Sequence, residues 1–248
     1  MSQDKAITLG HPSYVWGFGQ ERRLELVRRF VALEDRAILD VGCGLGMYVQ
    51  AFRRFSQDVH GVDIDREKIT EASQNLPNLR VAPAEQLPYA DGRFDLVFSH
   101  EVIEHVSDDR QAIADAVRVL KTGGRLVVFA PNRLYPFETH GAYWRGEYHF
   151  GNIPLVNYLP RRWRDRFCPH VRAYTRRDLR HLLAGLPLRI VVHTQIFPGY
   201  DKLIQRRPAM GQILRRITYL LERTSMRALG LSHFLVAERL TRDTTAAK

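Results

Sequence analysis

The stretch Asp40-Val41-Gly42-Cys43-Gly44-Leu45-Gly46 decides the fold. Residues 37–41 form a short apolar run that the glycines stop, which is typical of a buried strand. Glycines let the backbone turn sharply and approach a ligand, and a following helix presents free N–H groups at its positive end. We therefore expect a ligand-binding loop outside the carboxyl end of a strand. Its expected members are Asp40, Gly42, Gly44 and Gly46.

The spacing of the glycines limits the class of ligand that this loop is expected to bind. A dinucleotide fingerprint requires G-x-G-x-x-G, but the third position is Met47 counting from Gly42 and Val49 counting from Gly44. The next apolar run, residues 58–64, carries Asp63, which can accept hydrogen bonds from ribose hydroxyls. Alternatively, Asp63 or Asp65 caps the helix expected to begin at Arg66. The pattern favours a nucleoside-containing ligand other than NAD.

Apolar runs and helical patterns alternate along the chain, which predicts an α/β fold with a mostly parallel sheet. With 248 residues, 45% of them hydrophobic, one large domain is possible. Expected strands are residues 37–41, 58–64, 94–99, 125–130, 188–196 and 232–240, and expected helices are residues 21–33, 47–55, 66–75, 109–120 and 175–186. Residues 121–124 read as a helix stop and a turn.

Residues 132–171 interrupt the alternation. They are aromatic, rich in His, Pro and Arg, and without a clear period. A segment this long is rarely a simple connection, so we interpret the chain as a single domain, 1–248, with an inserted substrate lid, 132–171. The lid side chains that could form an aromatic, polar-tipped acceptor pocket are Glu138, His140, Tyr143, Trp144, Tyr148 and Phe150. Surface packing under a long loop is the alternative.

The net charge of +10 is unevenly distributed. Residues 1–131 carry a net charge of −3 and residues 132–248 a net charge of +13. The second part therefore faces either an anionic partner (nucleic acid, a membrane surface or a phosphorylated substrate) or only solvent. Residues 209–227 form a basic amphipathic stretch with Met210, Ile213, Leu214, Ile217, Leu220 and Leu221 on one face. With Arg215, Arg216 and Arg223 it could rest on anionic lipid, but packing on a sheet is the commoner arrangement.

The sequence also bears on the cellular compartment of the protein, through spanning helices, signal peptides and cysteines. No run approaches the roughly 18 consecutive apolar residues of a spanning helix. The first ten residues contain no apolar stretch of signal-peptide length. Only Cys43 and Cys168 are present, and Cys43 sits inside the glycine loop, where a disulfide would be awkward. We expect a cytoplasmic protein without disulfides.

Several segments together resemble the class I S-adenosylmethionine-dependent methyltransferases. Residues 38–44 resemble the first motif, 61–63 the ribose-binding acid, 84–89 and 93–97 the segments that flank adenine and form the fourth strand, and 120–124 the turn into the fifth. The resemblance runs over residues 37–131 and more weakly over 175–240. It implies a Rossmann-like, doubly wound, seven-stranded sheet whose last strand is antiparallel, with the lid inserted after the fifth strand.

The resemblance also implies S-adenosylmethionine as the cofactor. Its expected binding residues are Asp40, Gly42, Gly44, Gly46, Asp63, Ile64, Ala84, Glu85 and His100. One departure concerns adenine. Many relatives have Asp at the position of Pro83, where its side chain meets the adenine amino group. Here the N–H of Ala84 could meet a ring nitrogen, with Glu85 as a partial substitute for the missing Asp.

Acidic residues and a histidine follow the fourth strand. Glu101, Glu104 and His105 stand at i, i+3 and i+4, so a helical turn would carry them on one face, as half of a divalent-metal shell. In ubiquinone-pathway O-methyltransferases and small-RNA terminal-ribose methyltransferases a similar run is joined by a downstream His. His170 falls at that place, with His140 and His149 as competitors. Structural packing is the favoured reading over metal, and His105 or His170 is the candidate base or ligand.

The resulting hypothesis is O-methylation of a small-molecule or lipid-linked acceptor. A ribose-directed RNA methyltransferase and a non-catalytic cofactor-binding module are the alternatives. Amino-directed nucleic-acid enzymes carry an Asp/Asn-Pro-Pro-aromatic run after the fourth strand, whereas residues 99–102 read Ser-His-Glu-Val. Before the first helix, Tyr14, Trp16 and Arg22 could close over the methionine end of the cofactor; alternatively, Arg22 is a basic residue on a solvent face.

Overall fold

Seven strands form one sheet, in the order β10-β11-β5-β4-β1-β2-β3. The computed structural model describes residues 16–241. The strands are β1 (Ile38–Val41), β2 (Val59–Asp63), β3 (Leu79–Val81), β4 (Phe94–His100), β5 (Leu120–Pro131), β10 (Leu188–Ile196) and β11 (Ser232–Arg239). Parallel pairing joins β1 to β2 and β4, β2 to β3, and β4 to β5, while the last strand is antiparallel. The predicted Rossmann-like sheet is confirmed.

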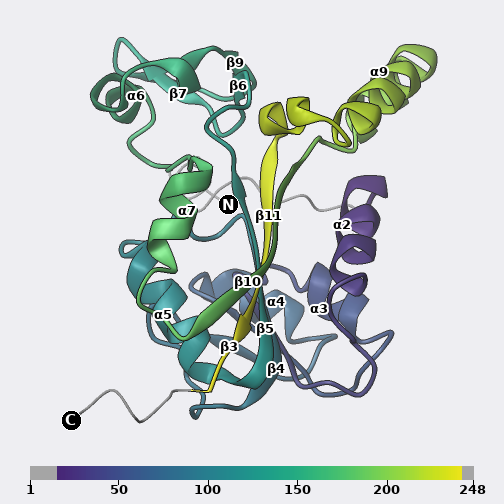
Figure 1. Cartoon of the computed structure of the whole chain (residues 1–248), viewed down its shortest axis with the longest axis vertical. Helices are drawn as coiled ribbons and strands as arrows, with labels where there is room; N and C mark the ends of the chain where they lie inside the picture. Colours follow the sequence, from purple (N-terminus) through teal and green to yellow (C-terminus); the bar gives the residue numbers. More distant parts are fainter. Residues whose placement is uncertain (1–15, 242–248) are drawn as a thin grey trace. The chain divides into compact units, whose positions relative to one another are not determined.

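Helices cover both faces of this sheet. They are α2 (Phe18–Arg28), α3 (Met47–Phe52), α4 (Arg66–Ala72), α5 (Asp109–Val119) and α7 (Arg176–Leu182). Figure 1 shows α5 on one face of the sheet and α3 on the other. All four residues of β1 are buried, as are Phe94, Leu96, Val97 and Phe98 of β4. A doubly wound fold requires central strands that are buried on both faces. The glycine loop therefore begins where β1, a central strand, ends.

The contacts divide the chain into two compact units. Among the described residues, the glycine-loop unit comprises 25–129, 180–193 and 235–241, and the lid unit comprises 16–24, 130–179 and 194–234. Three strands, β5, β10 and β11, run from one range into the other. The single domain expected over 1–248, with its lid at 132–171, stays a prediction.

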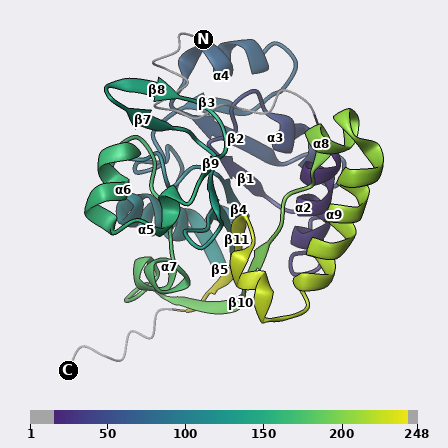
Figure 2. The ribbon, with the colours of Figure 1, turned by 90° about the horizontal axis from the view of Figure 1, so that it is seen from above.

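The inserted segment has regular structure that its sequence did not reveal. Strands β6 (Phe137–Glu138) and β9 (Ile153–Pro154) pair, as do β7 (Ala142–Trp144) and β8 (Glu147–His149). A short 3-10 helix, η1 (Val156–Tyr158), and α6 (Arg161–Phe167) complete it, and Figure 2 shows the β7–β8 hairpin and α6. Strands of two or three residues are too short to produce a readable period.

A buried arginine organises the lid. Arg164 is 1% exposed and donates to Asn157 Oδ1 (3.1 Å), Val171 O (2.9 Å) and Glu138 Oε2 (2.7 Å). Burial acts to raise the pKa of Glu138, but hydrogen bonding from His140 and the charge of Arg164 outweigh it and lower that pKa to about 2. The lid is therefore held by a desolvated ion pair whose members are both hydrogen-bonded.

The C-terminal helices complete the lid unit. They are α8 (Asp201–Arg206), α9 (Pro208–Leu221) and the 3-10 helix η2 (Ser225–Leu229). The commoner arrangement expected for the amphipathic stretch, with its apolar face packed inward, is wrong. Ile213, Ile217 and Leu220 are 51–61% exposed, because polar and aromatic side chains occupy the buried side of α9. Within residues 16–241, no helix is long and apolar enough to cross a membrane.

We predict that Arg164→Met destabilises the lid by about 3–5 kcal/mol, because Glu138 is left charged and buried. Urea unfolding followed by tryptophan fluorescence measures the loss. Since the folded pKa of Glu138 lies below its unfolded value, the stabilisation is complete above the unfolded pKa and is lost as pH falls towards 2.

Arg166→Ala, on the exposed side of the same helix, serves as the control and should change stability by less than about 0.5 kcal/mol. The double variant Arg164→Met/Glu138→Leu should recover most of the loss. Equal destabilisation by Arg164→Met and Arg166→Ala would contradict the role of the buried pair.

Candidate functional site

The glycine loop turns in backbone conformations that side chains rarely adopt. Gly42, Gly44 and Gly46 have φ of 72°, 54° and 79°. A Cβ on Gly42 would lie 2.3 Å from Val102 Cγ2, and one on Gly46 would lie 2.4 Å from Leu76 Cδ1, whereas one on Gly44 would meet nothing within 4 Å. Two glycines are therefore required by packing, and the third leaves space in which a ligand can approach the backbone.

Asp63 ties the end of β2 to this loop. Its Oδ2 accepts from Gly44 N and its Oδ1 from Asp65 N, both at 2.8 Å. The side chain of Asp65 caps α4 by accepting from Glu67 N and Lys68 N. The capping function that the sequence left open thus belongs to Asp65. Each oxygen of Asp63 keeps a lone pair with which it can accept from a ligand hydroxyl.

Asp40 is a buried carboxyl with an unused oxygen. It is 2% exposed, and its Oδ2 has no hydrogen-bond partner among the described residues. Burial, and secondarily the charge of Asp63, raise the pKa of Asp40 well above its usual value of 3.8. An isolated buried carboxylate is unfavourable. A cationic ligand group beside Asp40 would offset that cost.

The other predicted contacts with a nucleoside are distributed around the ends of β2, β3 and β4. Ile64, at the end of β2, is 57% exposed, so a large apolar side chain stands uncovered next to Asp63. Ala84 lies half-buried in a turn closed by Gln86 N donating to Pro83 O at 3.2 Å. These placements leave the Ile64 side chain accessible to a planar ring.

Glu85 has a structural function that the sequence did not indicate. Its Oε1 accepts from Ser107 N (2.8 Å) and Asp108 N (3.2 Å), which fixes the loop before α5. Because Oε1 is engaged in these hydrogen bonds, Oε2 is the oxygen with which Glu85 would replace the acid missing at Pro83. Adenine recognition by Ala84 and Glu85 stays a prediction.

The turn after β4 differs from its prediction. Glu101 N donates to Phe129 O (3.0 Å), which extends the β4–β5 pairing beyond His100, and Glu101 then takes a left-handed φ of 55°. Only a single turn follows, closed by His105 N and Val102 O at 2.9 Å, and α5 begins at Asp109. The expectation that Glu101, Glu104 and His105 share one face of a helical turn is therefore wrong.

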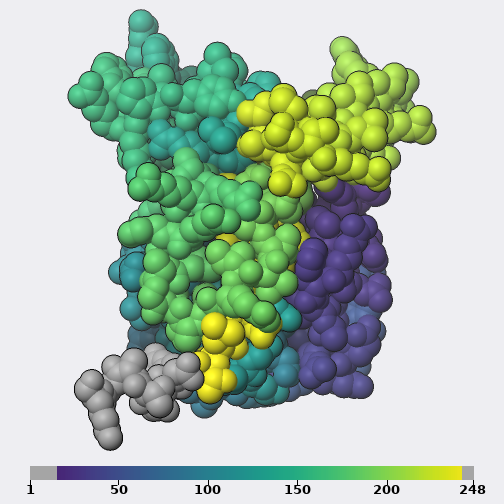
Figure 3. All heavy atoms as spheres, in the orientation of Figure 1, coloured from purple at the N-terminus to yellow at the C-terminus, as the bar shows by residue number. Residues whose placement is uncertain are grey.

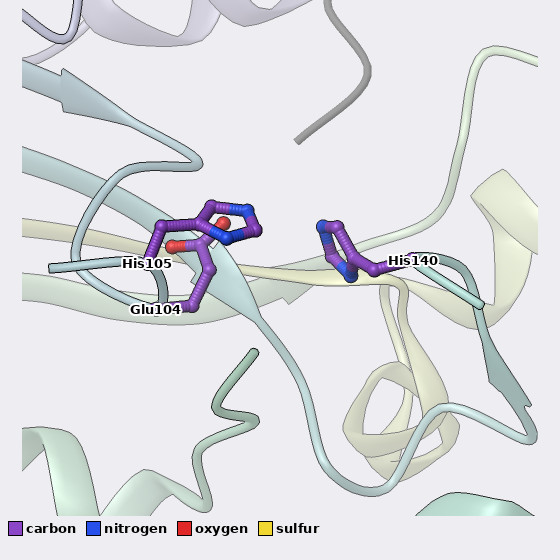
Figure 4. Close-up of side chains that lie close together, drawn as sticks. All are labelled: Glu104, His105 and His140. Atoms are coloured by element: carbon purple, nitrogen blue, oxygen red, sulfur yellow. The ribbon is translucent and has the colours of Figure 1, made fainter. Parts of the chain in front are cut away.

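Two of those side chains remain neighbours. Glu104 is 1% exposed, His105 is half-buried, and Figure 4 shows the two side by side. Among the described residues of the glycine-loop unit, no third side chain that could bind a metal lies close to Glu104 and His105. His100 packs its ring parallel to Phe98, with centroids 6.1 Å apart, and edge-on to Phe129 at 5.4 Å.

The lid histidines have partners of their own. His140, also labelled in Figure 4, has Nδ1 3.1 Å from Glu138 Oε1. His170 has Nε2 3.2 Å from the carbonyl oxygen of His140, and its ring meets those of Tyr143 and Tyr148 edge-on. Burial lowers the pKa of His170, so the neutral imidazole is favoured. His149 is exposed on β8.

The lid contains an apolar cavity of about 420 Å³. Its lining residues are Ala142, Tyr143, Trp144, His149, Ile153, Val156, Leu159 and Phe167. Trp144 and Phe167 stack with centroids 5.7 Å apart. Of the predicted pocket only Tyr143 and Trp144 line this cavity; the aliphatic side chains at 153–159 were missed because their segment shows no period. The cavity is apolar rather than polar-tipped.

Arg22 anchors helices of the lid unit to one another. It pairs with Glu222, donates to Phe197 O at 3.2 Å and lies 3.9 Å over the ring of Tyr219. The solvent-facing interpretation is wrong, because these contacts bury most of the Arg22 side chain, and the contact to the cofactor carboxylate stays a prediction. Trp16 donates to Glu21 Oε2 at 2.7 Å, and Tyr14 lies outside the described residues.

Comparisons with known proteins agree on the region around the glycine loop. Residues 39–128 match a family model described as "Methyltransferase domain". A probable S-adenosylmethionine-dependent methyltransferase of Mycolicibacterium smegmatis is 32% identical over 117 residues, 46% of each chain. A ubiquinone biosynthesis O-methyltransferase of Coxiella burnetii is 30% identical over 141 residues, 53% of this chain and 58% of that one. The chain thus spans about half the length of these curated relatives.

Solved structures share the fold at low identity. An S-adenosylmethionine-dependent methyltransferase from Mesorhizobium loti aligns with a TM-score of 0.63 at 19% identity, covering 90% of this chain and 99% of that one. The [4+2]-cyclase SpnF aligns with a TM-score of 0.60 at 18% identity, covering 94% and 85%. Because proteins with these two different names share the architecture, the fold alone does not identify the reaction.

We predict that Asp40→Asn stabilises the ligand-free protein at neutral pH, because it removes a carboxyl that burial makes costly to ionise. The folded pKa of Asp40 lies above its unfolded value, so ionisation penalises folding increasingly as pH rises from about 4. The gain in Tm should therefore be small near pH 4 and largest near pH 8. Thermal unfolding of both proteins across this range measures it.

Glu71→Gln, at an exposed carboxylate on α4, is the matched control and should give no such trend. A lower Tm for Asp40→Asn throughout the range would mean that Asp40 stabilises the fold.

Proposed function

We propose that this member of the class I S-adenosylmethionine-dependent methyltransferase family methylates a hydroxyl oxygen of a small-molecule or lipid-linked acceptor. Membership in the family rests on the methyltransferase domain at residues 39–128 and on the named relatives, and it confirms the resemblance found in the motifs. S-adenosylmethionine is the cofactor of this family. The observation that carries the proposal is the buried Asp40 carboxyl, whose Oδ2 has no hydrogen-bond partner among the described residues, beside an open glycine loop.

The residues at this site suit that cofactor. S-adenosylmethionine carries a cationic ammonium and a sulfonium, either of which would compensate a carboxylate at Asp40. Asp63 would accept from the ribose hydroxyls, and the exposed side chain of Ile64 would cover a face of the adenine. Gly44 provides space for the ligand, and His100 and Ala84 are the further proposed contacts. The fit is one of charge, space and hydrogen-bonding capacity.

Methyl transfer requires alignment more than covalent catalysis. The bound cofactor supplies an electrophilic methyl group, and holding the acceptor oxygen in line with it supplies much of the acceleration. A hydroxyl acceptor must also lose a proton, so a base is needed. We propose His105 for this role. His170, whose Nε2 lies 3.2 Å from the carbonyl oxygen of His140, is the second candidate. A metal at Glu104 and His105 stays a secondary hypothesis.

The lid cavity supports an acceptor with an apolar part. Its walls are aliphatic and aromatic, and its volume suits a substituted ring or a short chain. The name of the Coxiella burnetii relative points to an O-methyl acceptor, at 30% identity. RNA methylation is favoured only by the net charge of +13 over residues 132–248. The alternative of a non-catalytic binding module predicts cofactor binding without turnover.

The cofactor assignment is tested by calorimetric titration with S-adenosylmethionine and its demethylated product. We expect both to bind, and Asp40→Asn to weaken binding by roughly 10- to 100-fold, because a charge-assisted hydrogen bond is lost. Addition of magnesium should leave both affinities unchanged. Failure of both ligands to bind would refute the proposal, and a strong dependence on magnesium would favour the metal hypothesis.

The transfer step is tested with labelled cofactor, phenols that do or do not carry an alkyl chain, and RNA. We expect transfer to the alkyl phenols. Val156→Phe, which fills the lid cavity, should raise KM with little change in kcat. His105→Ala should lower kcat by about 10²- to 10⁴-fold, the usual contribution of a general base.

Leu134→Phe, at an exposed position outside the cavity, is the control for Val156→Phe. Label incorporated only into RNA would establish the alternative function. Unchanged turnover in both His105→Ala and His170→Ala would remove these histidines from the mechanism.

A further inference from the structure

Helix α9 presents a continuous apolar face to solvent. Met210, Ile213, Leu214, Ile217 and Leu220 are all exposed, the least by 37% and the most by 61%. At about 100° per residue these side chains cover one side of the helix. The light-green segment of α9 lies at the surface in Figure 3. A ridge of this kind on a 14-residue helix is unusual in a soluble domain, where such side chains normally face the core.

The opposite side of α9 is fixed in place. Gly211 packs on α8, since a Cβ there would lie 2.6 Å from Ile204 Cγ1, and Figure 2 shows the two helices side by side. Tyr219 lies beneath the guanidinium of Arg22, and Glu222 accepts from Phe197 N at 2.7 Å. Turning the apolar face inward would break these contacts. The exposed ridge is therefore the orientation that the surrounding residues hold.

Positive charge surrounds this ridge. Arg216 is exposed on α9, Arg223 is exposed two residues after its end, and Arg206 and Arg207 are exposed just before it. The acidic side chains of residues 201–227 are Asp201 and Glu222, and both are engaged. Asp201 accepts from Phe18 N (3.0 Å) and Gly19 N (3.1 Å), and Glu222 pairs with Arg22. The charge presented outward by this segment is cationic.

We infer that α9 docks in the plane of a bilayer that contains anionic lipid. Its aliphatic ridge would enter the boundary between headgroups and acyl chains, while the arginines meet lipid phosphates. A second copy of the chain would cover the ridge but would bring two cationic strips together. RNA would meet the arginines but leave the aliphatic ridge exposed. This inference does not depend on the proposed methyl acceptor.

Flotation of the full chain with vesicles tests the inference. We expect the protein to float with phosphatidylcholine vesicles containing phosphatidylglycerol, to float poorly with phosphatidylcholine alone, and to lose binding at high salt. Ile213→Ser/Ile217→Ser/Leu220→Ser should lower partitioning by at least about tenfold, because three buried aliphatic side chains are lost. Arg216→Ser/Arg223→Ser should also lower it by about tenfold, mainly for the anionic vesicles.

The matched control is Ile190→Ser/Val191→Ser, which removes exposed apolar side chains from β10 and should float like the parent protein. Circular dichroism and thermal unfolding verify that each variant folds, and the α9 variants should bind the cofactor like the parent protein, since the proposed cofactor residues lie in the glycine-loop unit. Flotation without cofactor binding would leave this inference intact and refute only the proposed function.

Two results would overturn the inference. The parent protein could stay at the bottom of the gradient with anionic vesicles, or the aliphatic triple variant could float as well as the parent. A dimer detected by light scattering that the triple variant dissociates, together with absent flotation, would assign the ridge to a second copy of the chain.

Discussion

The hydrogen bonds accepted by the Asp63 carboxylate are the interactions on which the shape of the glycine loop depends. By accepting from Gly44 N and Asp65 N, the carboxylate joins the glycine loop, the end of β2 and the start of α4. Side-chain packing at Gly42 and Gly46 then leaves Gly44 as the position where the backbone faces open space. The loop is thus pre-formed, and a ligand need not spend binding energy on ordering it.

The same arrangement places two carboxyl groups, those of Asp40 and Asp63, close to the glycine loop. Asp40 lies buried near Asp63, so desolvation and like charge both disfavour its ionisation. A cationic ligand bound beside these carboxyl groups would stabilise their ionised forms. S-adenosylmethionine is such a cation. The apolar cavity and the α9 ridge with its surrounding arginines belong to the lid unit, whose sequence lies wholly outside the matched domain. We therefore propose that the shared segment binds the cofactor and that the segments outside it recognise the acceptor and the membrane.

Local patterns allowed much of the fold to be predicted. The glycine loop, Asp63, β10 and the start of α5 were recognisable because each depends on neighbouring residues. The face of Glu101 was mispredicted because its N–H pairs with Phe129 of a different strand. The secondary structure of the lid could not be predicted from the sequence, because its strands are very short and its conformation depends on the ion pair between Arg164 and Glu138. For α9 the apolar face was correct and its orientation wrong, because Arg22, far away in sequence, fixes the polar side.

The central claim is that a buried carboxyl at Asp40 receives a cationic cofactor. Calorimetry of S-adenosylmethionine binding in buffers of different ionisation enthalpy measures the protons exchanged. Because a cation stabilises the ionised carboxylate, we predict proton release on binding at mildly acidic pH and its disappearance in Asp40→Asn. Binding of equal strength in both proteins, with the same proton exchange, would contradict the account.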